Sequence, residues 1–186
     1  MPHALLSPQW LLQDTVTLAQ QLLGKTLAVK EDSGDFSTYT LIETEAYTAD
    51  DPACHAYGTT AQTVGTKRSA SLYKSPGTAY VYLIYGMHHC LNVVTEAEHT
   101  AGAVLFRGIR SDEDGSVILG PGRLCKTLGV TKATHNHLDL CSPHSPIQLW
   151  EAQSVPKEKI LATPRIGISQ ATERLWRFID TRYIQK

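Results

Sequence analysis

The chain has 186 residues, 42% of them hydrophobic and 19% charged, which is long enough for one domain with a sizeable core. We therefore expect a single domain over residues 1–186. No apolar run approaches the roughly 20 residues that a membrane-spanning helix needs. The N-terminus lacks the basic start and apolar stretch of a secretory signal. These features argue against a membrane or exported protein and predict a cytosolic one.

The formal net charge of −1 argues against a DNA-binding protein when composition alone is considered, because lysine and arginine supply most of the affinity for phosphates. Three acidic residues are clustered at 112–114, however, and many basic residues flank the motifs described below. A local basic face that binds DNA is therefore compatible with the sequence. The four cysteines are widely spaced and form no CxxC pair, which predicts reduced and mostly buried thiols.

The first predicted elements are a helix and a β-hairpin. Asp14 is suited to cap a helix over residues 15–23, and Gly24 is suited to end it. Residues 26–30 and 37–47 are β-branched and apolar, and the turn-forming segment between them predicts a hairpin.

The rest of the chain predicts mostly strands. Residues 48–77 predict a long surface loop, and loops of that length in a compact domain are often functional. A short helix is expected between Pro121 and Gly129, and the segment from Ala171 is left unassigned. Because the strands cluster rather than alternate with helices, the fold class is α+β with a mixed or antiparallel sheet. The further strands are predicted at 78–84, 90–95, 103–108, 147–150 and 165–168.

The segment LIETEAY at 41–47 carries the first candidate chemistry. Side chains alternate on a strand, so Glu43, Glu45 and Tyr47 project to one face. For an isolated motif of this kind, a solvated acidic face is the more common explanation. The motif becomes a candidate active site only if other segments bring partners to it.

The segment YVYLIYGMHH at 80–89 offers such partners. Tyr80 and Tyr82 point to one face of their strand, and Tyr85 lies at a glycine-containing turn, where we expect it to be exposed. Packing within the turn explains Tyr85 equally well. An exposed aromatic wedge is nevertheless how some proteins unstack a base step, and aromatic walls hold flipped bases. Arg107 ends an apolar strand and either makes a salt bridge or, beside a carboxylate, helps to hold a water molecule.

One further cluster resembles a zinc-ligand set by its content alone. Its spacing matches no standard structural zinc site, and nearby prolines indicate an irregular loop. The HxE…PCxxC signature of zinc deaminases is also absent. We therefore expect no metal at this cluster, which consists of His135, His137, Asp139, Cys141 and His144.

Taken together, the motifs resemble the alkyladenine, or 3-methyladenine, DNA glycosylase family. They follow one another in the family's order from about residue 14 to residue 178. The resemblance implies a single α+β domain around a curved, mainly antiparallel sheet, like the C-terminal domain of methionyl-tRNA formyltransferase. It is carried by ETEAY (43–47), His55, SPGTAYVYLIYGMHHCLNVV (75–94), LFRG (105–108), GPGRLCKTLG (120–129) and RIGI (165–168).

The resemblance also implies a role for each matched residue. Glu45 would activate a water molecule that Arg107 and the main-chain carbonyl of Ile166 help to place. Tyr85 would fill the gap that the flipped base leaves. The pocket for the base would be lined by Tyr47, His55, Tyr82 and Asn92, of which Asn92 would lie where a guanine carries its 2-amino group.

The chain departs from the family at several positions. The family commonly has Arg-Asn and then a Met after Thr66, where this chain has KRS with Leu72 at the Met position. His88 replaces an aromatic residue of some members, and LWRFI at 175–179 replaces the usual Pro-x-Arg-Phe-Tyr. These departures concern DNA affinity and substrate range rather than the chemistry. Contacts to the DNA backbone are expected from Arg68, Arg123 and Lys126.

The expected protein is thus a monomeric DNA repair glycosylase without metal or other cofactor. It would flip an alkylated or otherwise damaged purine out of double-stranded DNA and hydrolyse its N-glycosidic bond. No lysine occupies a matched catalytic position, so the abasic site would stay uncut. The enzyme would work at the nucleoid of a bacterium or in the nucleus of a eukaryote. A non-catalytic nucleic-acid-binding module of the same fold is the alternative, and a metal-dependent hydrolase is a further rival.

Overall fold

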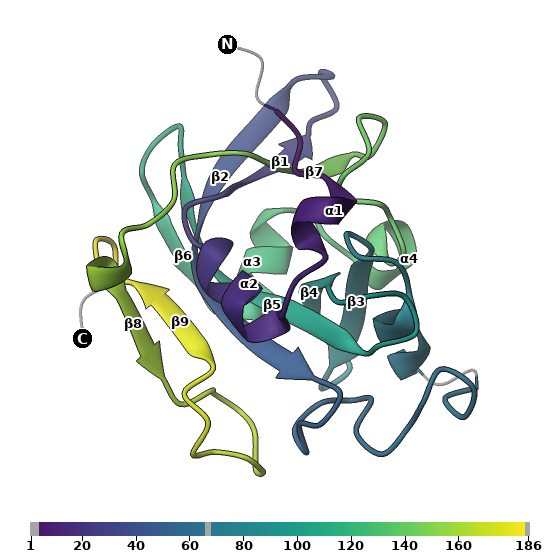
Figure 1. Cartoon of the computed structure of the whole chain (residues 1–186). Helices are drawn as coiled ribbons and strands as arrows, with labels where there is room; N and C mark the ends of the chain where they lie inside the picture. Colours follow the sequence, from purple (N-terminus) through teal and green to yellow (C-terminus); the bar gives the residue numbers. More distant parts are fainter. Residues whose placement is uncertain (1–3, 66–67, 185–186) are drawn as a thin grey trace.

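In the part of the chain that the structure describes, the sheet has nine strands, and every pairing between them is antiparallel. The computed structural model describes residues 4–65 and 68–184, and for Arg68 it describes the backbone alone. The continuous path across the curved sheet is β3-β4-β5-β2-β1-β7, with β6 beside β5 and the pair β8 and β9 beside β2 (Figure 1). The strands are β1 (Thr26–Lys30), β2 (Phe36–Thr48), β3 (Ala79–Ile84), β4 (His88–Val94), β5 (Gly102–Ser111), β6 (Val117–Leu119), β7 (Ile147–Trp150), β8 (Ile160–Thr163) and β9 (Arg177–Asp180).

Strand β2 is central because several neighbours share it. One edge pairs with β5 over residues 39–48, while the other edge pairs with β1 over 36–40 and with β9 over 43–45. The ladder with β5 shifts register on both sides of Glu43. Such irregularities bend a strand and re-aim its side chains, and they are common beside active sites.

The helices of the described chain are short, and two of them cover one face of the sheet. Helix α2 contacts β2 and β5, and α3 contacts β4 and β5 (Figure 1). The side chain of Asp14 accepts a hydrogen bond from the Thr17 amide (2.8 Å) and caps α2. The helices are α1 (Pro8–Leu11), α2 (Thr15–Gln21), α3 (Pro121–Thr127) and α4 (Lys132–His135), with 3₁₀ helices η1 (Arg68–Tyr73) and η2 (Lys157–Lys159).

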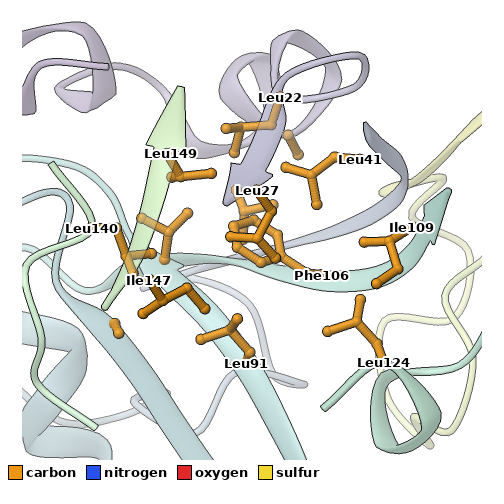
Figure 2. Packing of buried hydrophobic residues seen from close by; sticks show 14 of the residues in the cluster. Leu22, Leu27, Leu41, Leu91, Phe106, Ile109, Leu124, Leu140, Ile147 and Leu149 are labelled. Carbon is orange, nitrogen blue, oxygen red and sulfur yellow. The ribbon is translucent and has the colours of Figure 1, made fainter. Parts of the chain in front are cut away.

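Two hydrophobic clusters lie on opposite faces of the sheet. The larger cluster lies under α2 and α3, and Figure 2 shows Phe106 in it among leucine and isoleucine side chains from helices and strands. Alternate residues of β3, β4 and β5 supply it, as the two-residue period of a strand requires. Burial of this apolar surface is the main stabilising contribution to the fold. Its strand residues include Ala79, Val81, Leu91, Val93, Val104 and Phe106.

The smaller cluster joins the other face of the sheet to the long segment between β2 and β3. This segment includes η1 and turns back over the sheet edge (Figure 1). Residues 48–77 were predicted as a surface loop, and this prediction is wrong in part, because several of their apolar side chains are buried. The cluster consists of Cys54, Ala56, Val64, Leu72, Tyr73, Tyr80, Val94, Ala101 and Ala103.

The structure confirms the α+β class, the curved antiparallel sheet, the capped helix and the first hairpin. The four cysteines are free, and three of them are buried, as expected. The prediction of a strand at 165–168 is wrong, because strands β8 and β9 lie on either side of that segment and were missed. Strand β6 and helices α1 and α4 were missed as well. The likeness to the formyltransferase domain stays a prediction.

Candidate active site

One row of directly paired residues crosses the sheet and brings predicted site residues to one face. Tyr80 lies opposite Asn92, Asn92 opposite Leu105, Leu105 opposite Glu45, and Glu45 opposite Arg177. Directly opposed residues of antiparallel strands project to the same side of a sheet. The row therefore faces away from the larger apolar cluster.

A cavity of about 490 Å³ is lined by Tyr80, Asn92 and Leu105 of this row and by other parts of the chain. Residues 52–55 and 166–170 and the turn between β3 and β4 complete its wall. Volumes of this order suit small ligands held by a few placed polar groups. The wall contains nearly all the predicted site residues, namely Tyr47, His55, Tyr82, Tyr85, Asn92, Arg107 and Ile166.

Glu45 lies directly behind this wall and is fully buried (0% exposed). Its Oε1 accepts a hydrogen bond from the amide of Ile166 (2.9 Å) and lies 3.3 Å from Nε of Arg107. Its Oε2 accepts a hydrogen bond from the hydroxyl of Tyr47 (2.8 Å). All three partners of the carboxylate belong to the cavity wall, so the structure brings Glu45, Arg107 and Ile166 together, although Ile166 contacts Glu45 through its amide.

A chain of alternating charges anchors the arginine. Nε of Arg107 lies 3.0 Å from Oε1 of Glu43, and Nε of Arg177 lies 2.6 Å from the same oxygen. Because Gly108 is the cross-strand partner of Glu43, a Cβ at position 108 would lie 2.8 Å from the Cβ of Glu43, so glycine is needed there. Buried charges are tolerated when they are paired and hydrogen-bonded in this way.

The surroundings of Glu45 change its proton affinity. Burial raises the pKa of Glu45 above its ordinary value, whereas Arg107, the Ile166 amide and the Tyr47 hydroxyl act to lower it. A carboxylate with a raised pKa is a stronger base once it is ionised. Perturbed carboxylates beside a cavity are candidates for catalysis.

A second buried arginine, which the sequence reasoning missed, holds the segment that carries Ile166. Arg165 donates hydrogen bonds to both carboxylate oxygens of Asp51 and to the carbonyl of Ala46 (2.9 Å). Its guanidinium also stacks on the rings of Tyr47 (4.7 Å to the centroid) and Trp176 (5.3 Å). In the sequence, only the arginine of the RIGI motif pointed to this contact. Asp51 gave no signal, because it lies in the segment 48–77, for which a surface loop is predicted.

The structure brings the aromatic residues of the predicted pocket close together. The rings of Tyr80 and Tyr82 lie 5.2 Å apart, and His55 meets Tyr82 edge-on at 4.8 Å. The Nδ1 atom of His55 lies 2.9 Å from the Tyr80 hydroxyl. Buried Asn92 donates its side-chain amide to the Tyr80 carbonyl (2.9 Å) and also lines the cavity. These side chains surround a space in which a planar base could stack.

Tyr85 is at the tip of the turn between β3 and β4 and is 87% exposed. Tyr85 and Gly86 both have positive φ values (51° and 71°), and the amide of Met87 closes the turn on the carbonyl of Ile84 (3.1 Å). These angles are typical of the tight turns that join antiparallel strands, although a non-glycine residue at positive φ is uncommon. The expected exposure of Tyr85 is confirmed, which argues against packing of its ring in the turn.

Arg123 and Lys126 are exposed on α3, whose first residue, Pro121, lines the cavity. Their predicted contacts to DNA stay predictions. The side chain of Arg68 lies outside the described residues, as does Lys67. Within the ranges that the structure describes, no group of three or more His, Cys, Asp or Glu residues is placed to hold a metal ion. His137 instead has Nε2 2.7 Å from the Ser71 hydroxyl.

Comparison with known proteins places these motifs in context. The sequence model of the family described as "Methylpurine-DNA glycosylase (MPG)" matches residues 9–183. Proteins named "Putative 3-methyladenine DNA glycosylase" from Ehrlichia chaffeensis and Sodalis glossinidius are each 41% identical to the chain. The alignments cover 96% of this chain and 94% and 98% of those proteins. A protein of the same name from Wolbachia pipientis subsp. Culex pipiens is 43% identical over 96% of this chain and 91% of its own. Among the described residues, no helix is long and apolar enough to cross a membrane.

Proposed function

The chain belongs to the methylpurine-DNA glycosylase family, and from this premise we propose that it excises 3-methyladenine and related damaged purines, with Glu45 as the catalytic base. The reaction is hydrolysis of the N-glycosidic bond in base excision repair. The observation that carries the assignment of Glu45 is its place directly behind the cavity wall, with Arg107, Ile166 and Tyr47 as its partners.

One carboxylate is enough for this chemistry. Alkylation at N3 or N7 gives the purine a positive charge, so the base leaves as a neutral molecule without an acid. Ionised Glu45 then takes a proton from the attacking water and stabilises the positive charge that develops on the sugar. Arg107 and the main chain of Ile166 would orient that water. No lysine is found among the described residues of the cavity wall, which supports hydrolysis without a Schiff base to the sugar.

The cavity wall supports a preference for electron-poor rings. Tyr47 and Tyr82 would stack on the base, and a cationic purine gains about 0.5–2 kcal/mol from each such cation–π contact. His55 would close the side of the pocket, and Asn92 would meet the edge where guanine carries its 2-amino group. We therefore expect alkylated adenine to be preferred over unmodified purines.

Tyr85 would act as the wedge, because it is exposed at the mouth of the same cavity. Inserted into the duplex, it would occupy the space of the flipped nucleotide and offset the cost of unstacking. Arg123 and Lys126 would contact phosphates. We propose that residues 1–186 act as one monomeric glycosylase domain without a cofactor, in the compartment that holds DNA.

The test is excision from duplexes that each carry one lesion, with alkali used to reveal abasic sites. Wild-type protein should release 3-methyladenine from DNA, and Glu45→Gln should lower excision by at least about 10²-fold, the usual scale for loss of a general base. Binding of the lesion duplex and the thermal unfolding temperature should change little. Near-wild-type excision by purified Glu45→Gln would refute the assignment of Glu45.

A further inference from the structure

Glu45 is closed off from the cavity that should deliver its water. The carboxylate is fully buried, and both of its oxygens already have partners. The attacking water must lie next to one of these oxygens and must also reach the sugar of a base held in the cavity. Because none of the carboxylate is exposed, a group that covers it has to move before water can reach it, and its three partners are the groups in contact with it.

Two of the three partners are fixed. Arg107 is also paired with Glu43, which is paired with Arg177, so its withdrawal would leave buried charges unpaired. The amide of Ile166 belongs to the main chain next to Arg165, whose guanidinium is held by Asp51 and Ala46. Tyr47 differs, because its contact with Glu45 is one hydrogen bond from the end of a side chain that lines the cavity, and the stacking of Arg165 on its ring (4.7 Å) does not involve the hydroxyl.

We propose that the hydroxyl of Tyr47 occupies, in the free enzyme, the place beside Oε2 of Glu45 that the attacking water must take. Entry of the flipped base would displace this hydroxyl, because the ring of Tyr47 belongs to the wall against which the base must stack. Tyr47 is then a positioning residue that opens Glu45 to water only when the pocket is filled. This inference rests on the proposed function of Glu45.

The chemistry of the phenol suits this role. Burial raises the pKa of Tyr47 far above its ordinary value, and the adjacent Glu45 raises it further, so the hydroxyl stays protonated and donates to the carboxylate. A hydrogen bond to the charged form lowers the pKa of a carboxyl group. Tyr47 thus favours ionised Glu45 in the free enzyme, and it is a poor acid for delivering a proton to the base.

The test is the pH dependence of excision by wild-type protein and Tyr47→Phe, measured in single turnovers with enzyme in excess. Excision needs ionised Glu45, so its rate is lost as the pH falls through the pKa of Glu45. At low enzyme concentration, the pH dependence of the rate reports the pKa of Glu45 in the free enzyme. At saturating enzyme concentration, it reports the pKa of Glu45 in the complex with DNA. For each protein, the acidic limb is the part of the profile in which the rate falls at low pH. We compare the pH at which this fall occurs at low and at saturating enzyme concentration, not the maximal rate.

Loss of the hydroxyl should raise the pKa of Glu45 in the free enzyme alone. The acidic limb at low enzyme concentration should therefore move to higher pH by about one unit in Tyr47→Phe. The limb at saturation should stay in place, because the hydroxyl has already left Glu45 in the wild-type complex. Tyr73→Phe is the matched control: it removes a buried hydroxyl that donates to Thr59 (2.8 Å) outside the cavity wall, and it should move neither limb.

Three results would overturn the proposal. If neither limb moves, the hydroxyl does not act on Glu45. If both limbs move equally, the hydroxyl stays on Glu45 while the base is bound. If Tyr47→Phe loses excision of a neutral base such as hypoxanthine but keeps that of a cationic one, the hydroxyl is a proton donor to the base. Full activity of Glu45→Gln would instead refute the proposed role of Glu45, on which this inference rests, so the two failures are distinguishable.

Discussion

Strand β5 places Phe106 on one face of the sheet and Arg107 on the other, and both side chains are almost completely buried. Phe106 packs in an apolar cluster, where burial stabilises the fold directly. Burial of Arg107 removes a charge from water, and that cost is offset by its pairs with Glu43 and Glu45. Equal burial therefore has opposite consequences for the two residues, since Phe106 supports folding and Arg107 belongs to the candidate site.

The largest expected effect of a single substitution on stability belongs to the apolar face. Phe106→Ala should lower the free energy of unfolding by about 3–5 kcal/mol, because it leaves a cavity in the larger cluster. The molecules that remain folded should still excise damaged bases, since Phe106 points away from the site. Denaturant unfolding and single-turnover excision of the folded fraction check both statements. A stable variant that has lost excision would mean that the two faces are not separate in function.

Tyr85→Ser should have the reverse pattern, because Tyr85 belongs to the polar face but lies outside the core. Excision from duplex DNA should fall about tenfold or more, since unstacking costs a few kcal/mol and serine cannot fill the gap. The free energy of unfolding should change by less than about 0.5 kcal/mol. The control is Tyr183→Ser, a partly exposed tyrosine outside the cavity wall, which should excise normally. Lowered stability with wild-type excision in Tyr85→Ser would refute the wedge.

Chelation should have the smallest effect, namely none. The proposed steps use no metal, and His137 of the rival cluster is held by Ser71. Incubation with a chelator should therefore leave both excision and the thermal unfolding temperature unchanged. Stoichiometric zinc in the purified protein, with loss of activity on its removal, would show that polar groups away from the sheet face take part in the chemistry.

Much of this contrast could be predicted from local sequence. The two-residue period of strands is enough to separate Glu43, Glu45 and Tyr47 from their apolar neighbours. The turn at Tyr85 and Gly86 was recognisable from its glycine, and the cap of α2 from Asp14. These features depend on neighbouring residues alone, which is why they are visible without a structure.

Other features depend on contacts between distant segments. The pairing of Arg165 with Asp51 joins two segments 114 positions apart, and no local pattern predicts it. Strand β9 pairs with β2 over residues 43–45, just beyond the part of β2 that pairs with β1, so its existence follows from the sheet rather than from its own four residues. The closure of Glu45 by Tyr47 was likewise invisible, because alternation places both on one face without showing that they touch.

The most direct test of the account is the crystal structure of Glu45→Gln bound to a duplex that carries one alkylated adenine. We predict the damaged base inside the cavity between Tyr47 and Tyr82, and the ring of Tyr85 in the vacated space of the duplex. We also predict a water molecule between the sugar and the amide that replaces the carboxylate. A damaged base that stays stacked in the duplex, with Tyr85 on the protein surface and no water beside the substituted side chain, would contradict the account.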